Sequence, residues 1–526
     1  MRIPPLRRRQ FVRVATAASG AATIGIPRLS DVSAAQPATA RRQQDAPNSK
    51  MFTHGVASGD PLHDRVIIWT RVTPTPASAP GQNSGPATDV AWEVSEDPAF
   101  RHVVRTGTVR THADRDHTVH IDVDGLRAAT TYHYRFHAGG RTSPVGRART
   151  APAPGSRAGV RFGVASCANY RSGYYTAYQY LAGRRDIDAV LHLGDYIYEQ
   201  GSEEDDVRIP APTHECVSLA DYRARYGQCR ADPDLRALHA AAPFIATWDD
   251  HEICGNTWSG GAGDHDPATE GHWADRAAAA KQAYFEWMPV RQALTGSTRR
   301  RLHFGQLLDL TMLDLRSFRS EQVAPTDTAG MGDPSRTLLG RSQMAWLKDG
   351  LTRSSSTWHL IGSSVVAMPW LLPTGRPEPA TSVNTDGWDG YQAEQRELFA
   401  HLRDHGIGNA VILSGDVHSS WVGQVTAHDN KNPLASQFVV SSITSPTLGS
   451  INSSVTASAV LAVNPQISWG DVASNGCGVL DVTTDRVQFD WYKTADRTQP
   501  DSPVTHVTSY AVAVRSGRLT TVPTPV

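Results

Sequence analysis

The feature that most constrains this chain is a series of short apolar runs, each followed directly by side chains able to bind metals or protons. The runs are VRFGVASC, LHLGDYIYE, FIATWDDHE and VILSGDVH. The side chains are those of Cys167, Asp195, Tyr198, Asp249, Asp250, His251, Asp416 and His418. Segments with helical spacing, such as GYYTAYQYLAG and QAEQRELFAHLRDHG, separate some of the runs. Apolar strands that alternate with helices predict an α/β fold with a layered core and buried strands.

Each of these residues also has a purely structural explanation when it is taken alone. Asp195 follows a glycine and suits a turn or a helix cap. Tyr198 could pack as a large apolar ring, and Cys167 as a small buried hydrophobe. His418 could be a simple hydrogen-bonded group. In open α/β sheets, however, ligands bind beyond the carboxyl ends of the strands, so four strands ending in this way predict one shared site.

The adjacent carboxylates of Asp249 and Asp250 are the hardest to explain structurally. Two like charges at the end of an apolar strand repel each other unless a cation or a raised pKa relieves them. Carboxylates combined with histidine suit hard or borderline divalent ions, and a bridging carboxylate can hold two ions about 4 Å apart. Such a pair of ions orients a phosphoryl oxygen and activates water, and His251, which lies beside the carboxylates in the sequence, could protonate the leaving oxygen.

The phenol and the thiol narrow the expected metal. A phenol titrates near 10, so Tyr198 would act as a ligand at neutral pH only for a strong Lewis acid, of which ferric iron is the expected example. A thiolate from Cys167 on the same ion is compatible with this.

The first 40 residues predict an export signal. An arginine cluster precedes an apolar, alanine-rich run from Val14 to Ile26, and small residues follow near Ala35 and Ala40, where cleavage is expected. The run is shorter than the roughly 20 residues of a membrane span. RRQFVR, at 8–13, resembles a twin-arginine signal, which implies the twin-arginine export machinery and a secreted product without a stable membrane span.

Composition bounds the remaining classes. Removal of the first 35 residues takes away six Arg and one Asp, so the formal net charge falls from −1 to −6, and no basic field indicates nucleic acid. Short strand-like runs such as RVIIWTRV and TYHYRFHA predict a small all-β sandwich over 50–152. The linker PAPGSRAG leads to the α/β domain, expected over 158–526 and monomeric.

Six motifs in order carry a family resemblance: GVASGDP, ASC, GDYIYE, WDDHE, LDLRSFR and SGDVH. With them the chain resembles the PhoD-type alkaline phosphatases of the calcineurin-like metallophosphoesterase superfamily. The resemblance spans almost the whole mature chain. It implies a metallophosphoesterase core behind a fibronectin-III-like sandwich. It also implies a secreted enzyme that hydrolyses phosphate mono- and diesters at alkaline pH by metal-activated water or hydroxide attack.

The resemblance also assigns roles to residues. It implies a ferric ion held by Cys167, Asp195, Tyr198 and His418. It implies one or two calcium ions, replaceable by Mn²⁺ or Mg²⁺, held by the bridging Asp195 with Asp250 and Asp416, and more weakly by Asp249. His251 and Arg316 would contact the phosphate. Arg316 and Arg319 could each form a surface ion pair instead. One bidentate guanidinium on the phosphate is physically reasonable, and Arg316 is the residue chosen for it. Cys254 and Gly255 depart from the family's pattern, which leaves a metal role for Asn256 in doubt.

The cysteine count is odd: Cys167, Cys216, Cys229, Cys254 and Cys477. An exported protein with an odd number leaves one unpaired. If Cys167 binds iron as the resemblance implies, one of three possible pairings joins Cys216 to Cys229 and Cys254 to Cys477.

Two other functions stay open at this stage. A phospholipase D-like or teichoic-acid-type phosphodiesterase would use the same metal site, because specificity depends on loops such as 199–217, 256–267 and 369–391. In the last loop, Trp370, Leu371 and Leu372 either meet a lipid or pack inward. A secreted carbohydrate- or cell-wall-binding protein would leave the metal-type residues unexplained.

Overall fold

The structure, a computed structural model of the chain, describes residues 50–291, 296–374, 381–426, 433–514 and 516–526. The predicted export signal therefore lies outside the described residues. Within these ranges, no helix has the length and apolar character needed to cross a membrane.

A ten-stranded sheet contains the first three metal-type motifs. Its order is β26-β25-β24-β23-β9-β10-β11-β1-β2-β5, with β9, β10, β11 and β1 parallel and the other pairs antiparallel. The strands are β1 (Val56–Gly59), β2 (Val66–Arg71), β5 (Thr118–Val123), β9 (Val160–Ala165), β10 (Ala189–His192), β11 (Phe244–Ala246), β23 (Gly476–Val482), β24 (Arg486–Thr494), β25 (Val504–Ala513) and β26 (Leu519–Val522).

A seven-stranded sheet contains the remaining motifs. Its order is β14-β15-β16-β19-β21-β20-β22, and β15, β16, β19 and β21 are parallel. The strands are β14 (Arg300–Phe304), β15 (Leu308–Met312), β16 (Trp358–Gly362), β19 (Ala410–Ser414), β20 (Ser420–Thr426), β21 (Pro433–Val439) and β22 (Ile467–Asp471). Two hairpins, β12 (Thr257–Trp258) with β13 (Gly261–Ala262) and β17 (Leu371–Pro373) with β18 (Thr381–Val383), lie in the connecting loops.

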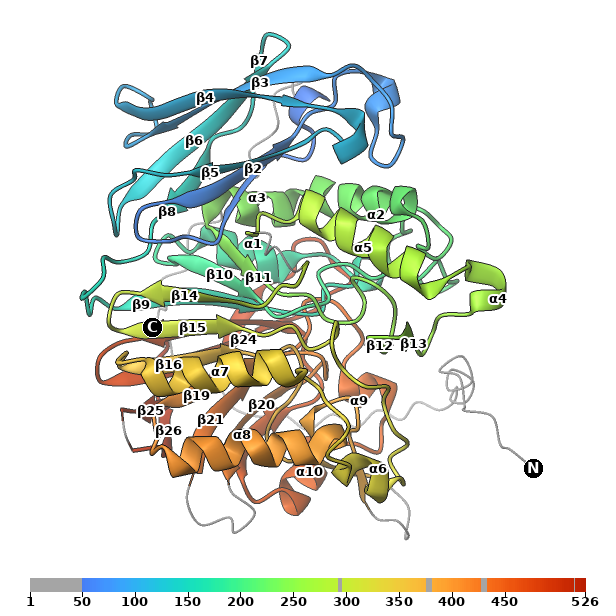
Figure 1. Cartoon of the computed structure of the whole chain (residues 1–526), viewed down its shortest axis with the longest axis vertical. Coiled ribbons are helices and arrows are strands. Elements are labelled where there is room, and N and C mark those ends of the chain that lie inside the picture. Colours follow the sequence, from blue (N-terminus) through green and yellow to red (C-terminus); the bar gives the residue numbers. More distant parts are fainter. Residues whose placement is uncertain (1–49, 292–295, 375–380, 427–432, 515) are drawn as a thin grey trace, which may run out of the picture. The chain divides into compact units, whose positions relative to one another are not determined.

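Helices cover the outer faces of the two sheets (Figure 1). The α-helices of the described residues are α1 (Thr176–Gly183), α2 (Leu219–Ala231), α3 (Pro233–Ala241), α4 (Pro267–Glu270), α5 (Trp273–Trp287), α6 (Thr328–Gly332), α7 (Arg341–Arg353), α8 (Gln392–Asp404), α9 (Leu448–Ile451) and α10 (Ala457–Val463). Local sequence sets their starts: Ser218 and Asp221 form a capping box at α2, and Asp232 caps α3 ahead of a proline.

Strand β10 shows how the alternation of a strand builds the layers. Val190 belongs to an apolar cluster with Leu181 of α1 and Leu235 of α3, whereas the next residue, Leu191, packs with Leu310 of the seven-stranded sheet. On the far side, α7, α8 and α10 share a third cluster with β16, β19, β20 and β21. The core is therefore a stack of helices, sheet, sheet and helices.

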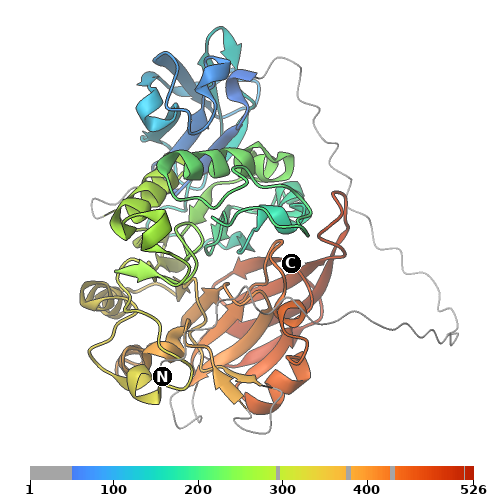
Figure 2. The same ribbon diagram turned by 90° about the vertical axis from the view of Figure 1, so that its right-hand side faces the viewer.

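The N-terminal segment is all β. Its five-stranded sheet joins β3 (Thr88–Ser95), β4 (Val103–Thr111), β6 (Thr131–Ala138), β7 (Arg141–Thr142) and β8 (Gly146–Arg149). This sheet packs on β1, β2 and β5 through its own apolar cluster. Helices α2, α3 and α5 lie between the five-stranded sheet and strands β10 and β11 (Figure 1), and Figure 2 shows the same arrangement from the side, whereas β1 pairs directly with β11. The predicted fold class is confirmed: a layered α/β core follows a small all-β unit.

Register brings the motifs to one edge. Ala165, His192 and Ala246 are neighbours across β9, β10 and β11, so the residues two or three positions later emerge side by side. Met312, Gly362 and Leu413 are neighbours in the same way across β15, β16 and β19. The carboxyl ends of both sets of parallel strands therefore carry the predicted site residues, as expected for α/β sheets.

Candidate metal centre

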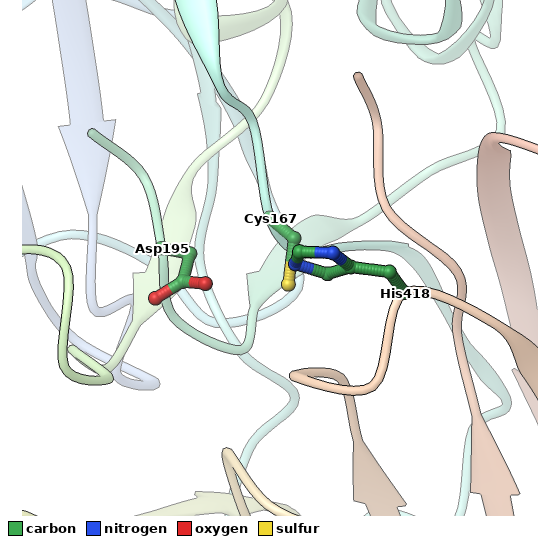
Figure 3. A group of neighbouring side chains, drawn as sticks. All are labelled: Cys167, Asp195 and His418. Carbon is green, nitrogen blue, oxygen red and sulfur yellow. The ribbon is translucent and has the colours of Figure 1, made fainter. Parts of the chain in front are cut away.

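Three predicted ligands from different loops meet beyond the strand ends. Ligand atoms of Cys167, Asp195 and His418 all lie within 4.8 Å of one another. Figure 3 shows these three side chains at the ends of their separate loops. Nδ1 of His418 lies 2.9 Å from the carbonyl oxygen of Pro446. A proton on Nδ1 satisfies that carbonyl, so Nε2 keeps its lone pair for a ligand bond.

Tyr198 completes this group. Its hydroxyl lies 2.8 Å from Oδ2 of Asp195 and 3.1 Å from Nε2 of His418, and it accepts a hydrogen bond of 2.7 Å from Ser445. A sulfur, a phenol oxygen, a carboxylate and an imidazole thus come together around one point. This is the mixed donor set expected from the sequence.

A second group shares Asp195. Its members are Asp195, Asp250 and His251, whose ligand atoms again lie within 4.8 Å of one another. Asn256 contacts this group through its backbone, since its N–H donates a hydrogen bond of 2.6 Å to the carboxylate of Asp250. Asp195 is the residue common to both groups, so its two oxygens can serve two neighbouring ions.

Burial raises the pKa of these acidic groups well above their usual values. For Cys167, burial acts first and the neighbouring Asp195 adds to it. For Asp195, burial outweighs the opposing effect of His251, and Asp250 and Asp249 raise the pKa further. Burial, Asp386 and Asp249 do the same for Asp416. A cation would relieve this concentration of buried acidic groups.

Glu252 holds two of the loops together and was not predicted from the sequence. Its carboxylate accepts backbone N–H bonds from Asp195 (3.1 Å), Tyr196 (2.7 Å) and Asp249 (2.8 Å). Burial raises the pKa of Glu252 to about 7 despite these bonds. In the sequence, Glu252 is marked only by its position as the last residue of the motif WDDHE.

Arg316, the predicted phosphate contact, is fully buried and bound by carboxylates. Its guanidinium contacts both oxygens of Asp249 (2.6 and 3.0 Å) and both oxygens of Asp386 (3.0 and 2.8 Å). Nη2 also lies 3.8 Å from Asp250 and 4.0 Å from Asp416. Asp249 lies in none of the three groups with ligand spacing that the described residues form, and its carboxylate is bound by Arg316 instead. Asp386, from a distant loop, was not predicted.

Arg319 is bound to the same loop as Asp386. Its Nε donates to the hydroxyl of Tyr391 (2.9 Å), and Nη2 donates to the backbone oxygen of Asp386 (3.1 Å). It is buried as well. Both arginines of LDLRSFR therefore fasten the loop around Asp386 onto the strand ends.

The predicted disulfides are wrong for this structure. All five cysteines are free and buried. The Cys229 thiol accepts a hydrogen bond of 3.7 Å from Tyr175, and Cys254 lies beside Glu199 and Glu215. Burial raises the pKa of Cys216 and Cys477 to about 12, which makes these thiols unreactive. Counting cysteines could not reveal that Cys216, Cys229 and Cys477 pack in the apolar cluster beneath the helices.

Trp370 packs inward, with only 2% of its surface exposed, whereas Leu371 is 37% exposed. The sequence had left both positions open.

Two family models match the chain: "PhoD-like phosphatase" over residues 162–491 and "PhoD-like phosphatase, N-terminal domain" over residues 36–152. Alkaline phosphatase D of Bacillus subtilis (strain 168) is 38% identical over 449 residues, which cover 81% of this chain and 75% of the relative. A solved structure of PhoD matches with a TM-score of 0.82 at 34% identity, covering 91% of this chain and 94% of that one.

A purple acid phosphatase from yellow lupin (Lupinus luteus) seeds matches with a TM-score of 0.54 at 13% identity, covering 87% of this chain and 73% of the lupin chain. At this level of identity the match concerns the fold alone.

Proposed function

The chain belongs to the PhoD-like phosphatase family and is a phosphoesterase, and from this premise we propose that it is an exported, metal-dependent enzyme that hydrolyses phosphate mono- and diesters at alkaline pH. The observation that carries the metal dependence is the position of Asp195, which belongs to two three-residue groups with ligand spacing. A single carboxylate between two such groups is the arrangement that a two-ion site requires.

The residues of the first group fit a ferric ion. Cys167, Asp195, Tyr198 and His418 provide soft and hard donors within contact of one another, and the phenol bridges the carboxylate and the imidazole. Phenolate and thiolate both favour a strong Lewis acid. We assign the iron to these four residues.

The residues of the second group fit calcium or another hard divalent ion. Asp195 and Asp250 offer carboxylate oxygens, and Asp416 lies close to the same charge cluster, 4.0 Å from Nη2 of Arg316. Bound ions would polarise the phosphoryl oxygens and lower the pKa of a water molecule.

The protein's own groups then orient the substrate and move a proton. His251 faces the carboxylates of Asp195 and Asp250, and Glu199 lies 2.8 Å from its Nδ1, so Nε2 is the nitrogen left for the leaving oxygen. Arg316 fixes Asp249 and Asp386 at the rim of the charge cluster. We propose that the main role of Arg316 is to hold these two carboxylates, and that contact with the phosphate is its second role.

Metal content and activity of the purified mature protein test this function. We expect stoichiometric iron, a phenolate–iron absorption band, and turnover of p-nitrophenyl phosphate and its bis ester that EDTA abolishes. Cys167→Ser should lose iron and activity, whereas Cys216→Ser, a buried thiol outside both groups, should retain them. Full activity in an iron-free, chelated sample would contradict the proposal. Preferential turnover of phosphatidylcholine would favour the phospholipase alternative.

We also propose that residues 1–40 are a twin-arginine-type signal, that 50–152 is the N-terminal domain and that 158–526 is the catalytic domain. Changing Arg8 and Arg9 to lysine should retain the precursor in the cytoplasm. Secretion of that variant at the wild-type level would exclude the twin-arginine route.

A further inference from the structure

A second buried glutamate, Glu199, lies directly behind His251. It follows Tyr198 at the end of GDYIYE, and 1% of its surface is exposed. Oε2 lies 2.8 Å from Nδ1 of His251, and Oε1 accepts the backbone N–H of Gly255 at 2.7 Å. One carboxylate thus fixes both the imidazole and the turn that follows it.

The imidazole is held on two sides. The ring of Tyr198 stacks on the ring of His251, with centroids 4.1 Å apart and planes 29° apart. Glu199 then fixes rotation within that plane, because the carboxylate accepts the proton on Nδ1. The ring has two nitrogens, so this bond leaves Nε2 as the one that can serve the substrate.

A metal role for Glu199 does not fit its surroundings. Glu199, Glu215 and Cys254 do form a group with ligand spacing. However, Arg276 donates to Glu215 (2.8 Å) and to Glu270 (2.6 Å), and it supplies the positive charge that a metal would bring. Both oxygens of Glu199 are already used. The carboxylate therefore acts through His251.

We propose that Glu199 is the positioning residue that aims Nε2–H of His251 at the leaving oxygen of the phosphate ester; this rests on the proposed function. In the step, a water oxygen bonds to phosphorus and the bond from phosphorus to the leaving oxygen breaks. The electron pair stays on the leaving oxygen, which takes the proton from Nε2. The water's proton passes to solvent, and solvent reprotonates His251. Glu199 remains a carboxylate throughout.

The test compares Glu199→Gln on two esters that differ in their leaving group. Glutamine keeps the shape, but its single amide oxygen can accept only one of the two N–H bonds. Nitrophenolate leaves without needing a proton, whereas an alkoxide does not. We expect kcat for an alkyl phosphate to fall about 10- to 100-fold. For p-nitrophenyl phosphate we expect a change of less than about 3-fold, with KM and metal content unchanged.

Three further variants sharpen the result. Glu215→Gln removes a neighbouring carboxylate that does not contact His251. It should leave kcat unchanged for both the alkyl phosphate and p-nitrophenyl phosphate. Glu199→Gln added to His251→Ala should cause no further loss, because both act on one proton. Glu199→Asp keeps the charge and should regain part of the alkyl ester rate. If Glu199→Gln does not fold, Glu199→Asp serves as the test instead. Its kcat should then fall relative to wild type for the alkyl ester and stay nearly unchanged for p-nitrophenyl phosphate.

Equal losses on the two esters, or a loss of bound metal, would overturn the inference, because either would show a structural or metal-binding role. A wild-type protein that hydrolyses neither ester would instead refute the proposed function. The two failures are therefore distinguishable.

Discussion

Acid should destabilise this protein through His192, a histidine buried at the end of β10. No part of its side chain is exposed, and Nε2 lies 2.7 Å from the hydroxyl of Tyr178. Nδ1 is buried without a hydrogen-bond partner in the described part of the chain. Burial lowers the pKa of His192 to about 3, against about 6.5 in the unfolded chain.

The sign of the effect follows from where the proton binds. Between about pH 3 and 6.5 the unfolded state holds a proton on this residue and the folded state does not, so stability is complete above this window and falls as pH decreases. Each pKa unit is worth about 1.4 kcal/mol, so a shift of about 3.5 units costs about 5 kcal/mol below pH 3. Between pH 7 and 5 the loss is about 2 kcal/mol.

Urea unfolding of wild type and His192→Gln at pH 7 and pH 5 measures this contribution. Glutamine can still bond to Tyr178 but does not titrate. The free energy of unfolding should fall about 2 kcal/mol more in wild type than in the variant over this range, because the other titrating groups cancel in the comparison. His63→Gln, an exposed histidine, should follow wild type. Equal losses in wild type and His192→Gln would refute the reasoning.

Three shorter predictions follow from the site. Glu252→Gln should lower the free energy of unfolding by about 1–3 kcal/mol and reduce iron content, because one of the three backbone N–H groups that Glu252 binds loses its acceptor. Unchanged urea unfolding and unchanged metal content would show that Glu252 does not hold the two loops together. Arg316→Ala should cost about 3–5 kcal/mol, because Asp249 and Asp386 lose their buried partner; lost activity at unchanged stability would favour the phosphate contact instead. Thiol titration of the denatured protein should find five free cysteines, and a count of one would restore the disulfides.

The strand ends could be predicted because the signal is local. An apolar run and the residue that follows it are adjacent in the sequence, and the parallel register then aligns the ends of β9, β10 and β11. For this reason Cys167 and Asp195 could be expected to meet. His418 follows β19 of the other sheet and joins them because the two sheets pack face to face, although about 250 residues separate it from Cys167. The all-β N-terminal unit was predictable from the same kind of local alternation.

The contacts of Arg316 could not be predicted, because they depend on tertiary packing. Asp386 lies in a loop between β18 and α8, and nothing near it in the sequence marks it as the partner of an arginine 70 residues away. Glu199 and Glu252 are the last residues of the motifs GDYIYE and WDDHE. Their carboxylates accept hydrogen bonds largely from backbone N–H groups, and because almost every residue carries such a group, the sequence does not show which ones they bind. A motif shows which side chains arrive, but not how their charges are divided among neighbours.

The backbone at these strand ends is strained in the same places where charge accumulates. Cys167, Asp195, Asp416 and His418 all have left-handed φ values, of 57°, 56°, 65° and 48°. Such a conformation costs about 1–3 kcal/mol at each non-glycine residue and persists only where its surroundings enforce it. Here the conformation is held by the packing of the two buried sheets and by the hydrogen bond from the backbone N–H of Asp195 to Glu252. Because both the strain and the buried charge oppose folding of the ion-free chain, a cation that binds only the folded state recovers stability by mass action. Metal binding and stability should therefore be coupled in this protein.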